Sequence, residues 1–198
     1  MIEVGLAKAG IKLIAGVDEA GRGACAGPLV IAALILRNLN EASLIEVTDS
    51  KQISPAKREA LYPIILDAAI DLSVIEISAN EIDEKGLHKC NIEGMRRAVS
   101  GLKVRPEYVL TDGYPVPGLD VPNLAVWKGD QVALSISAAS IVAKVQRDRM
   151  MDSLSEEYPG YGLADHKGYA TASHELALQR LGVSPIHRKS YANIAKFL

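Results

Sequence analysis

The chain has 198 residues, 48% of them hydrophobic, and a formal net charge of −2 at pH 7. This length favours one domain with a sizeable core, and the near-neutral charge gives no overall signal for a polyanionic partner. The longest apolar run, residues 28–36, is too short to span a membrane, and no secretory leader is recognisable at the N-terminus, so a cytoplasmic location is expected. The two cysteines form no motif and are expected to be free thiols.

Five apolar or β-branched runs predict strands. The first two are apolar on both faces, which is typical of strands in the middle of a sheet. The last two are short, and each ends close to an aspartate. The predicted strands are residues 12–18, 29–36, 72–77, 108–111 and 124–127. The single tryptophan, Trp127, closes the last strand and is expected to pack in the core.

Capping residues and apolar spacing predict six helices. Ser54-Pro55 supplies an N-cap followed by a proline in the first turn, and Ser78 precedes Glu81 at the spacing of a capping box. Asn91 is expected to cap a further helix. The predicted helices are 55–71, a short one after 78, 91–101 ending at a glycine, an amphipathic one over 134–157, 171–181 ending before Gly182, and a short one after 190.

This order of elements predicts an α/β fold, with a partly antiparallel sheet of about five strands and helices on its faces. The segment after residue 159 is expected to form a small helical lobe, which gives the domains 1–158 and 159–198. From residue 160 onward the chain has five Lys or Arg against two Asp or Glu, and three of the four histidines. A basic flank beside an acidic remainder is compatible with a nuclease, and equally with a solvated tail.

Four carboxylates follow apolar runs at predicted strand ends or turns: Asp18, Glu19, Asp112 and Asp130. Strand ends of one sheet can bring distant residues together, and oxygen ligands of this kind suit Mg²⁺ or Mn²⁺. Such ions can assist the hydrolysis of a phosphodiester. Each aspartate taken alone is also a common turn former. The adjacent pair is more informative, because two buried like charges are unfavourable without a compensating partner.

The turn Gly21-Arg22-Gly23 follows the first strand, so its arginine can approach a phosphate or a sugar backbone closely. A dinucleotide-binding fingerprint is the competing interpretation. It is disfavoured because the glycine spacing differs by one residue and the segment after it, residues 28–31, reads as strand instead of helix.

The chain resembles the type 2 prokaryotic ribonucleases H, the ribonuclease HII family. The resemblance covers nearly the whole chain, and several strings match in the same order. These strings are Gly16-Val17-Asp18-Glu19-Ala20-Gly21-Arg22-Gly23, Asp49-Ser50-Lys51, Asp112-Gly113, Lys128-Gly129-Asp130, residues 137–144, Arg147-Asp148, Tyr161-Gly162, His166-Lys167-Gly168-Tyr169 and His187-Arg188.

The resemblance implies a ribonuclease H-like fold and a metal-dependent endoribonuclease. It would hydrolyse the RNA strand of RNA–DNA hybrids and cut 5′ of single ribonucleotides in duplex DNA, leaving 3′-hydroxyl and 5′-phosphate ends by two-metal-ion catalysis. The implied cofactor is Mn²⁺ or Mg²⁺, and the implied role is repair of misincorporated ribonucleotides. The implied metal-binding and catalytic residues are Asp18, Glu19, Asp112 and Asp130.

The resemblance also implies how substrate is bound. Gly21, Arg22 and Gly23 would read the ribose 2′-hydroxyl through the backbone, Tyr169 would pack on the deoxyribose 3′ of the ribonucleotide, and Lys51 would contact a phosphate. Without the resemblance, Tyr169 is explained equally well as a core tyrosine with its hydroxyl at the surface, and Lys51 is explained as ordinary surface charge. His166 and His187 are expected to be solvated or capping residues without a catalytic role.

Two rival functions stay open. A metal-dependent phosphomonoesterase is disfavoured because no Asp-x-Asp nucleophile loop follows a strand. A non-catalytic hybrid-binding module is disfavoured because carboxylates without metal would repel a polyanion. The segment Asn193–Leu198 lacks the paired aromatics of a clamp-binding peptide, so no such partner is expected, and a monomer is expected.

Overall fold

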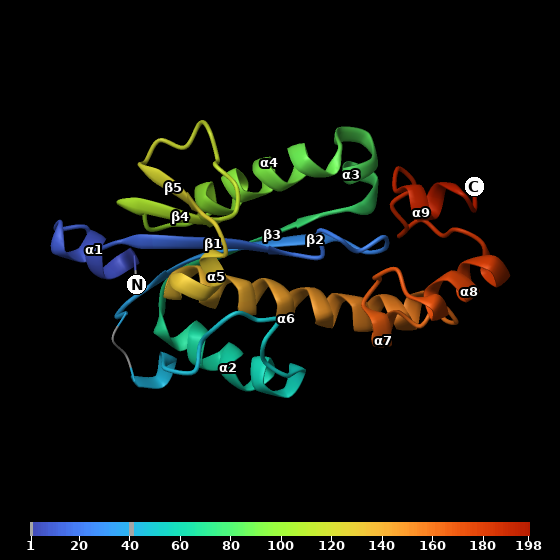
Figure 1. Cartoon of the computed structure of the whole chain (residues 1–198), viewed down its shortest axis with the longest axis horizontal. Helices are drawn as coiled ribbons and strands as arrows, with labels where there is room; N and C mark the ends of the chain where they lie inside the picture. The colour runs from blue at the N-terminus through green and yellow to red at the C-terminus, as the bar shows by residue number, and fades with distance from the viewer. Residues whose placement is uncertain (1, 40–41) are drawn as a thin grey trace.

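A computed structural model describes residues 2–39 and 42–198, and Figure 1 shows how its elements are arranged. The strands are β1 Ile14–Ala20, β2 Leu29–Leu36, β3 Ala69–Ile77, β4 Tyr108–Asp112 and β5 Asn123–Val126. The helices are α1 Ile2–Lys8, the 3₁₀ turn η1 Ala42–Leu44, α2 Pro55–Ala68, α3 Ala79–Lys85, α4 Leu87–Ser100, α5 Gly129–Val132, α6 Leu134–Glu157, α7 Leu163–His166, α8 Ala172–Leu181 and α9 Ala192–Ala195.

The five strands form one mixed sheet in the order β3-β2-β1-β4-β5. The strands β1, β2 and β3 pair antiparallel along the chain, whereas β4 pairs parallel with β1 and β5 pairs parallel with β4. The predicted α/β fold with a five-stranded mixed sheet and flanking helices is therefore confirmed.

Helices cover both faces of the sheet. Figure 1 shows α2, α5 and α6 on one face and α3 and α4 on the other. Close approach of α6 depends on Gly16 in β1, because a Cβ there would lie 2.1 Å from the Ser135 carbonyl carbon. One apolar core lies between the sheet, α2 and α6, and a second lies between the sheet and α4. The central strands β1 and β2 are thus buried on both sides, as the apolar runs predict.

Several predicted helix ends are confirmed at the level of single hydrogen bonds. Ser54 caps α2 by accepting from the Lys57 amide, and Ser78 caps α3 by accepting from the Glu81 amide. Gly101 and Gly182 end α4 and α8 as predicted. The helix predicted to run to residue 71 ends earlier, at Ala68, because the chain turns extended there and enters β3.

Two predictions about individual residues are wrong. Asn91 does not cap a helix, because α4 begins after Gly86, whose positive φ of 83° turns the chain out of α3. Asn91 lies inside α4 and is fully buried. Trp127 is not a core residue: 80% of its surface is exposed, because β5 is an edge strand that ends at Val126.

Helix α6 is only partly amphipathic. Every residue from Leu134 to Ala143 is buried, so the first half of the helix is covered on all sides. Only the second half, which runs toward the C-terminal helices, has the predicted exposed face.

The C-terminal helices pack around a third apolar cluster. It joins Leu163, Leu178 and Ile194 to Met151 of α6 and to Cys25 and Ala26 of the loop after β1. The segment after α6 is therefore seated on the loop between β1 and β2, and the predicted domain boundary at residues 158–159 stays a prediction. Within the described ranges, the structure has no helix that is both long and apolar enough to cross a bilayer.

Candidate metal centre and substrate site

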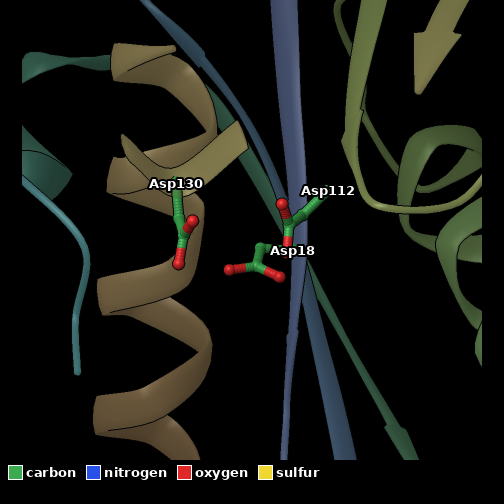
Figure 2. A group of neighbouring side chains, drawn as sticks. All are labelled: Asp18, Asp112 and Asp130. Carbon is green, nitrogen blue, oxygen red and sulfur yellow. The ribbon is translucent and has the colours of Figure 1, made fainter. Parts of the chain in front are cut away.

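Three of the four predicted carboxylates meet at one point. Asp18, Asp112 and Asp130 each offer an oxygen atom, and these oxygens lie within 4.8 Å of one another. Asp18 comes from β1, Asp112 ends β4 and Asp130 lies in α5. Figure 2 shows the three side chains turned toward the space between the sheet and the helix beside it.

The register of the sheet explains why they meet. Strand β1 pairs with β4 only as far as Val17 and Thr111, whereas its pairing with β2 continues to Ala20. The next residues, Asp18 and Asp112, therefore lie side by side where the parallel pair ends. The observed strand therefore begins and ends two residues later than the predicted one, and the aspartate lies within β1 instead of at its end.

The third aspartate depends on a tight turn. Lys128 has a left-handed backbone with φ 52°, and the Gly129 amide donates to Asp112 Oδ1 at 2.7 Å. A Cβ at Gly129 would lie 2.4 Å from the Ile136 Cδ1 atom and 3.2 Å from the Val126 Cβ atom, so a larger residue requires the neighbouring side chains to shift. The Ser137 hydroxyl in turn donates to the Asp130 carbonyl at 2.7 Å. This turn therefore joins the end of β4 to the start of α6 and places the Asp130 carboxylate.

The carboxyls raise one another's pKa. Burial is the main cause for Asp18, whose pKa lies well above its ordinary value, and the charges of Glu19 and Asp112 add to the effect. Burial followed by the Asp112 charge raises the pKa of Glu19 to about 7 and that of Asp130 to about 6. A buried group of this kind favours either protonation or a bound cation. Several carboxylate oxygens around one point suit Mg²⁺ or Mn²⁺.

Glu19 does not join the other three, because successive side chains of a strand point to opposite faces. Asp18 faces Ser140 of α6, whereas Glu19 faces Asn91 of α4. The Glu19 Oε2 atom is buried and has no hydrogen-bonding partner among the described residues, nor has the Asn91 amide. An unpartnered buried oxygen next to the three aspartates is what a further cation ligand would leave. The donor set therefore fits a divalent metal ion.

A fifth carboxylate, Asp49, borders the cluster, although its sequence pattern predicts no role for it. It adds to the raised pKa of Asp130, and it accepts hydrogen bonds from the Lys51 amide at 2.9 Å and from Gln131 Nε2 at 3.3 Å. The Lys51 ammonium lies 3.8 Å from Asp130 Oδ2. Its motif, Asp49-Ser50-Lys51, was the available signal, but a sequence cannot show that this loop folds against α5.

The Lys51 side chain is otherwise exposed, with 76% of its surface accessible. Burial alone would lower its pKa, but the surrounding carboxylates raise it above the usual lysine value. Lys51 is therefore a charged and accessible ammonium group at the rim of the cluster.

The glycine turn after β1 is held in a conformation that only glycine accepts. Gly21 has φ 89°, and a Cβ there would lie 1.9 Å from the Arg147 Nε atom. The Arg22 carbonyl accepts hydrogen bonds from Arg188 Nη1 at 3.1 Å and from the Tyr191 hydroxyl at 2.9 Å. The backbone of this turn is thus fixed by the C-terminal segment.

Tyr169 lies next to the same turn. A Cβ at Gly23 would have the Tyr169 ring as its nearest neighbour, at 3.9 Å from Cε1. Tyr169 is 37% exposed, and the cationic groups of Lys144 and Arg147 lie 5.8 and 5.5 Å from the centroid of its ring. An accessible aromatic face beside a glycine turn can contact a sugar.

The comparisons with known proteins agree on one family. The family model described as Ribonuclease HII matches residues 15–194. The chain is 53% identical to the Ribonuclease HII of Cutibacterium acnes, over 98% of this chain and 95% of the relative.

Solved structures give the same result. The crystal structure of ribonuclease H2 from Pyrococcus horikoshii aligns with a TM-score of 0.81 and 31% identity, over 93% of this chain and 96% of that one. The ribonuclease HII in the PCNA:RNase HII complex from Archaeoglobus fulgidus aligns with a TM-score of 0.79 and 26% identity, over 90% of this chain and 95% of that one. The chain therefore belongs to the ribonuclease HII family and is a metal-dependent ribonuclease H.

Proposed function

We propose that this ribonuclease H hydrolyses the RNA strand of RNA–DNA hybrids and also cuts 5′ of single ribonucleotides in duplex DNA. The products would be 3′-hydroxyl and 5′-phosphate ends. One observation carries the proposal: an aspartate cluster suited to a divalent cation lies at the end of the same strand that leads into the turn at Gly21 beside Tyr169. Chemistry on a phosphodiester and recognition of the neighbouring sugars can thus come from residues of one strand and of the turn that follows it.

Asp18, Asp112 and Asp130 would hold Mn²⁺ or Mg²⁺, and Glu19, with its unpartnered oxygen, would complete a site for two ions. When bound, such ions lower the pKa of water and offset the charge that develops on a phosphodiester. The protein residues supply a preformed acidic site, because Gly129 fixes Asp112 and Ser137 fixes the turn that carries Asp130. Little rearrangement is then needed when substrate arrives.

Recognition of the ribonucleotide would come from backbone groups. The turn at Gly21, Arg22 and Gly23 has no side-chain bulk at its two glycines, so its peptide groups can reach a 2′-hydroxyl, the group that separates RNA from DNA. Tyr169 would pack on the next sugar, and a 2′-hydroxyl there would collide with the ring. Lys51 at the rim would contact a phosphate of the same strand.

The partners are then RNA–DNA hybrids and ribonucleotide-containing DNA. The related protein from Archaeoglobus fulgidus is described in a complex with PCNA. For this chain we keep the predictions of a monomer without a clamp-binding peptide, a cytoplasmic location, and a role in ribonucleotide repair.

The test is a labelled DNA duplex with one ribonucleotide, incubated with Mn²⁺ or Mg²⁺ and read on a sequencing gel. A single cut on the 5′ side of the ribonucleotide is expected. The Asp112→Asn variant should fold and leave both this duplex and a long RNA–DNA hybrid intact, because it removes a charge from the cluster. Cutting only within long RNA runs would refute the junction proposal, and an active Asp112→Asn would refute the metal assignment.

A further inference from the structure

Three of the four histidines lie together next to the Tyr169 backbone, and none of them belongs to the aspartate cluster. His166 ends α7, His174 lies in the first turn of α8, and His187 follows α8. The His166 and His174 rings are stacked with centroids 4.3 Å apart, and His174 Nε2 lies 3.1 Å from His187 Nε2. Both His174 and His187 are only 1% exposed. No part of the proposed chemistry uses them, so their arrangement needs its own explanation.

The partners of each ring determine which nitrogen carries the proton. A backbone amide can only donate and a carbonyl can only accept. His187 Nδ1 has three polar contacts with Ser184: the amide at 3.1 Å, the hydroxyl at 2.8 Å and the carbonyl at 3.3 Å. The two shorter contacts come from groups that can donate, which assigns the proton of His187 to Nε2, where it points at His174. His174 Nδ1 lies 3.0 Å from the Tyr169 carbonyl, so the His174 proton is on Nδ1 and its Nε2 accepts from His187.

The resulting chain is continuous and has one direction. It runs from the Ser184 amide through His187 and His174 to the Tyr169 carbonyl, with both rings neutral. His166 does not interrupt it, because its Nδ1 accepts from the Gly168 amide at 3.2 Å and its Nε2 donates to the Tyr161 carbonyl at 2.8 Å. Both nitrogens of each ring are thus committed to polar neighbours.

Burial favours the neutral form of the His174 and His187 rings. Burial lowers the pKa of His174, and burial followed by the His174 charge lowers the pKa of His187 to about 4. The Cys25 thiol lies 3.7 Å from His174 Nδ1 and donates to the Gly168 carbonyl at 3.4 Å. The two facing imidazole nitrogens are hydrogen-bonded to each other and are therefore not free to bind a cation. The cluster is a chain of hydrogen bonds and not a metal site.

We infer that His174 and His187 are positioning residues for substrate recognition, because their hydrogen-bond chain fixes the Tyr169 carbonyl and thereby the ring that contacts the sugar. This inference rests on the proposed function of Tyr169. The Tyr169 amide already donates to the His166 carbonyl at 2.9 Å, so the histidine cluster holds the peptide groups on both sides of this residue.

A first test reads the chain itself and needs no substrate. The imidazole nitrogens of the folded protein are observed by ¹⁵N NMR near pH 7.5. The expected result is a protonated Nδ1 on His174 and a protonated Nε2 on both His166 and His187. The opposite tautomer on His174, or a charged ring at that position, overturns the inference whether or not the protein cuts single ribonucleotides.

A second test uses a matched pair of variants. His174→Asn keeps an amide donor near the place of Nδ1, whereas His174→Gln keeps a polar group near Nε2 and loses the bond to Tyr169. For the duplex with one ribonucleotide, His174→Gln should lower kcat/KM about tenfold, as expected for losing one buried hydrogen bond, and His174→Asn should stay close to wild type. Amide exchange at Tyr169 should become faster in His174→Gln alone.

Two comparisons separate positioning from a general loss of structure. In a Tyr169→Ala background, His174→Gln should have no further effect, because the two changes act through the same ring. The exposed histidine of α4, His88, supplies the control, and His88→Ala should change neither kcat/KM nor amide exchange. Equal losses in His174→Gln and His174→Asn, additivity with Tyr169→Ala, or unchanged Tyr169 amide exchange would each overturn the inference. A wild-type protein that ignores the single ribonucleotide would refute the proposed function, while the NMR and exchange results would still decide the hydrogen-bond chain.

Discussion

Removing one charge from the aspartate cluster should stabilise the metal-free protein while it abolishes activity. Asp130 is almost fully buried, and its pKa is raised from 3.8 to about 6 by burial and by the charges of Asp112 and Asp49. A shift of about 2 units corresponds to about 3 kcal/mol, so ionised Asp130 destabilises the fold by up to about that amount. Asp130→Asn keeps the shape without the charge, and its melting temperature in EDTA at pH 8 should exceed that of wild type by about 5 to 10 °C.

The sign of the pH dependence provides a second check. Because the folded pKa of Asp130 lies above the unfolded value, the folded protein binds more protons between pH 4 and pH 6. This group therefore lowers stability as the pH rises through that window, and the penalty is complete above it. The advantage of Asp130→Asn over wild type should accordingly be large at pH 8 and small at pH 4.

Calorimetric melts with EDTA, and with Mn²⁺ or Mg²⁺, measure both effects. Metal should raise the melting temperature of wild type more than that of Asp130→Asn, since the ion binds the folded cluster. Asp120→Asn removes an exposed charge and serves as the matched control, with no expected change. The reasoning is refuted if Asp130→Asn is no more stable than wild type in EDTA at pH 8, or if its advantage does not grow with pH.

Three further changes test other parts of the structure. Gly129→Ala should lower the rate of hydrolysis, because its Cβ would lie 2.4 Å from Ile136 Cδ1 and 3.2 Å from the Val126 Cβ atom, and the shift that relieves these contacts would disturb the turn; activity equal to wild type in a gel assay would contradict the packing described here. The folded pKa of His187, about 4, lies below its unfolded value, so the unfolded chain binds more protons between pH 6.5 and pH 4. The free energy of unfolding, measured in urea, should therefore fall by about 3 kcal/mol as the pH falls through that window, and it should depend less on pH in His187→Gln. Trp127→Ala should change the free energy of unfolding by less than about 0.5 kcal/mol, since the side chain is 80% exposed, and a loss of several kcal/mol in urea would show that it packs in the core after all.

The elements could be predicted from the sequence where local chemistry decides them. Ser54 and Ser78 cap helices because their hydroxyls satisfy free amides of the first turn, and this depends only on the next three residues. The buried strand β2 is predicted to the residue, because a run apolar on both faces has few other uses. Asn91 was misassigned because the same side chain suits a cap and a buried polar position, and only the fold shows that it faces Glu19.

The sequence predicted which aspartates belong to the site, but it predicted their spatial arrangement only in part. A pattern can show that Asp18, Asp112 and Asp130 follow strands or turns, but their meeting depends on β1 and β4 being parallel neighbours in a particular register. The proximity of Asp49 depends on a loop packing against α5, which leaves no periodic signal. The position of Trp127 was misjudged because an apolar strand was taken as evidence of burial, although an edge strand has only one protected side.

The path of β1 connects the two halves of the proposed reaction. Its alternation sends Asp18 toward α6 and Glu19 toward α4, so the acidic residues occupy both faces of one strand. Two residues later Gly21 turns the chain under Arg147, and Arg147 also donates from Nη1 to the Lys167 carbonyl at 2.9 Å. A single buried guanidinium therefore contacts both the turn that would read the ribose and the segment that leads to Tyr169. Displacing this guanidinium would disturb recognition of both the ribose and the sugar that follows it while leaving the acidic cluster in place, which is why recognition and metal binding should be separable by mutation.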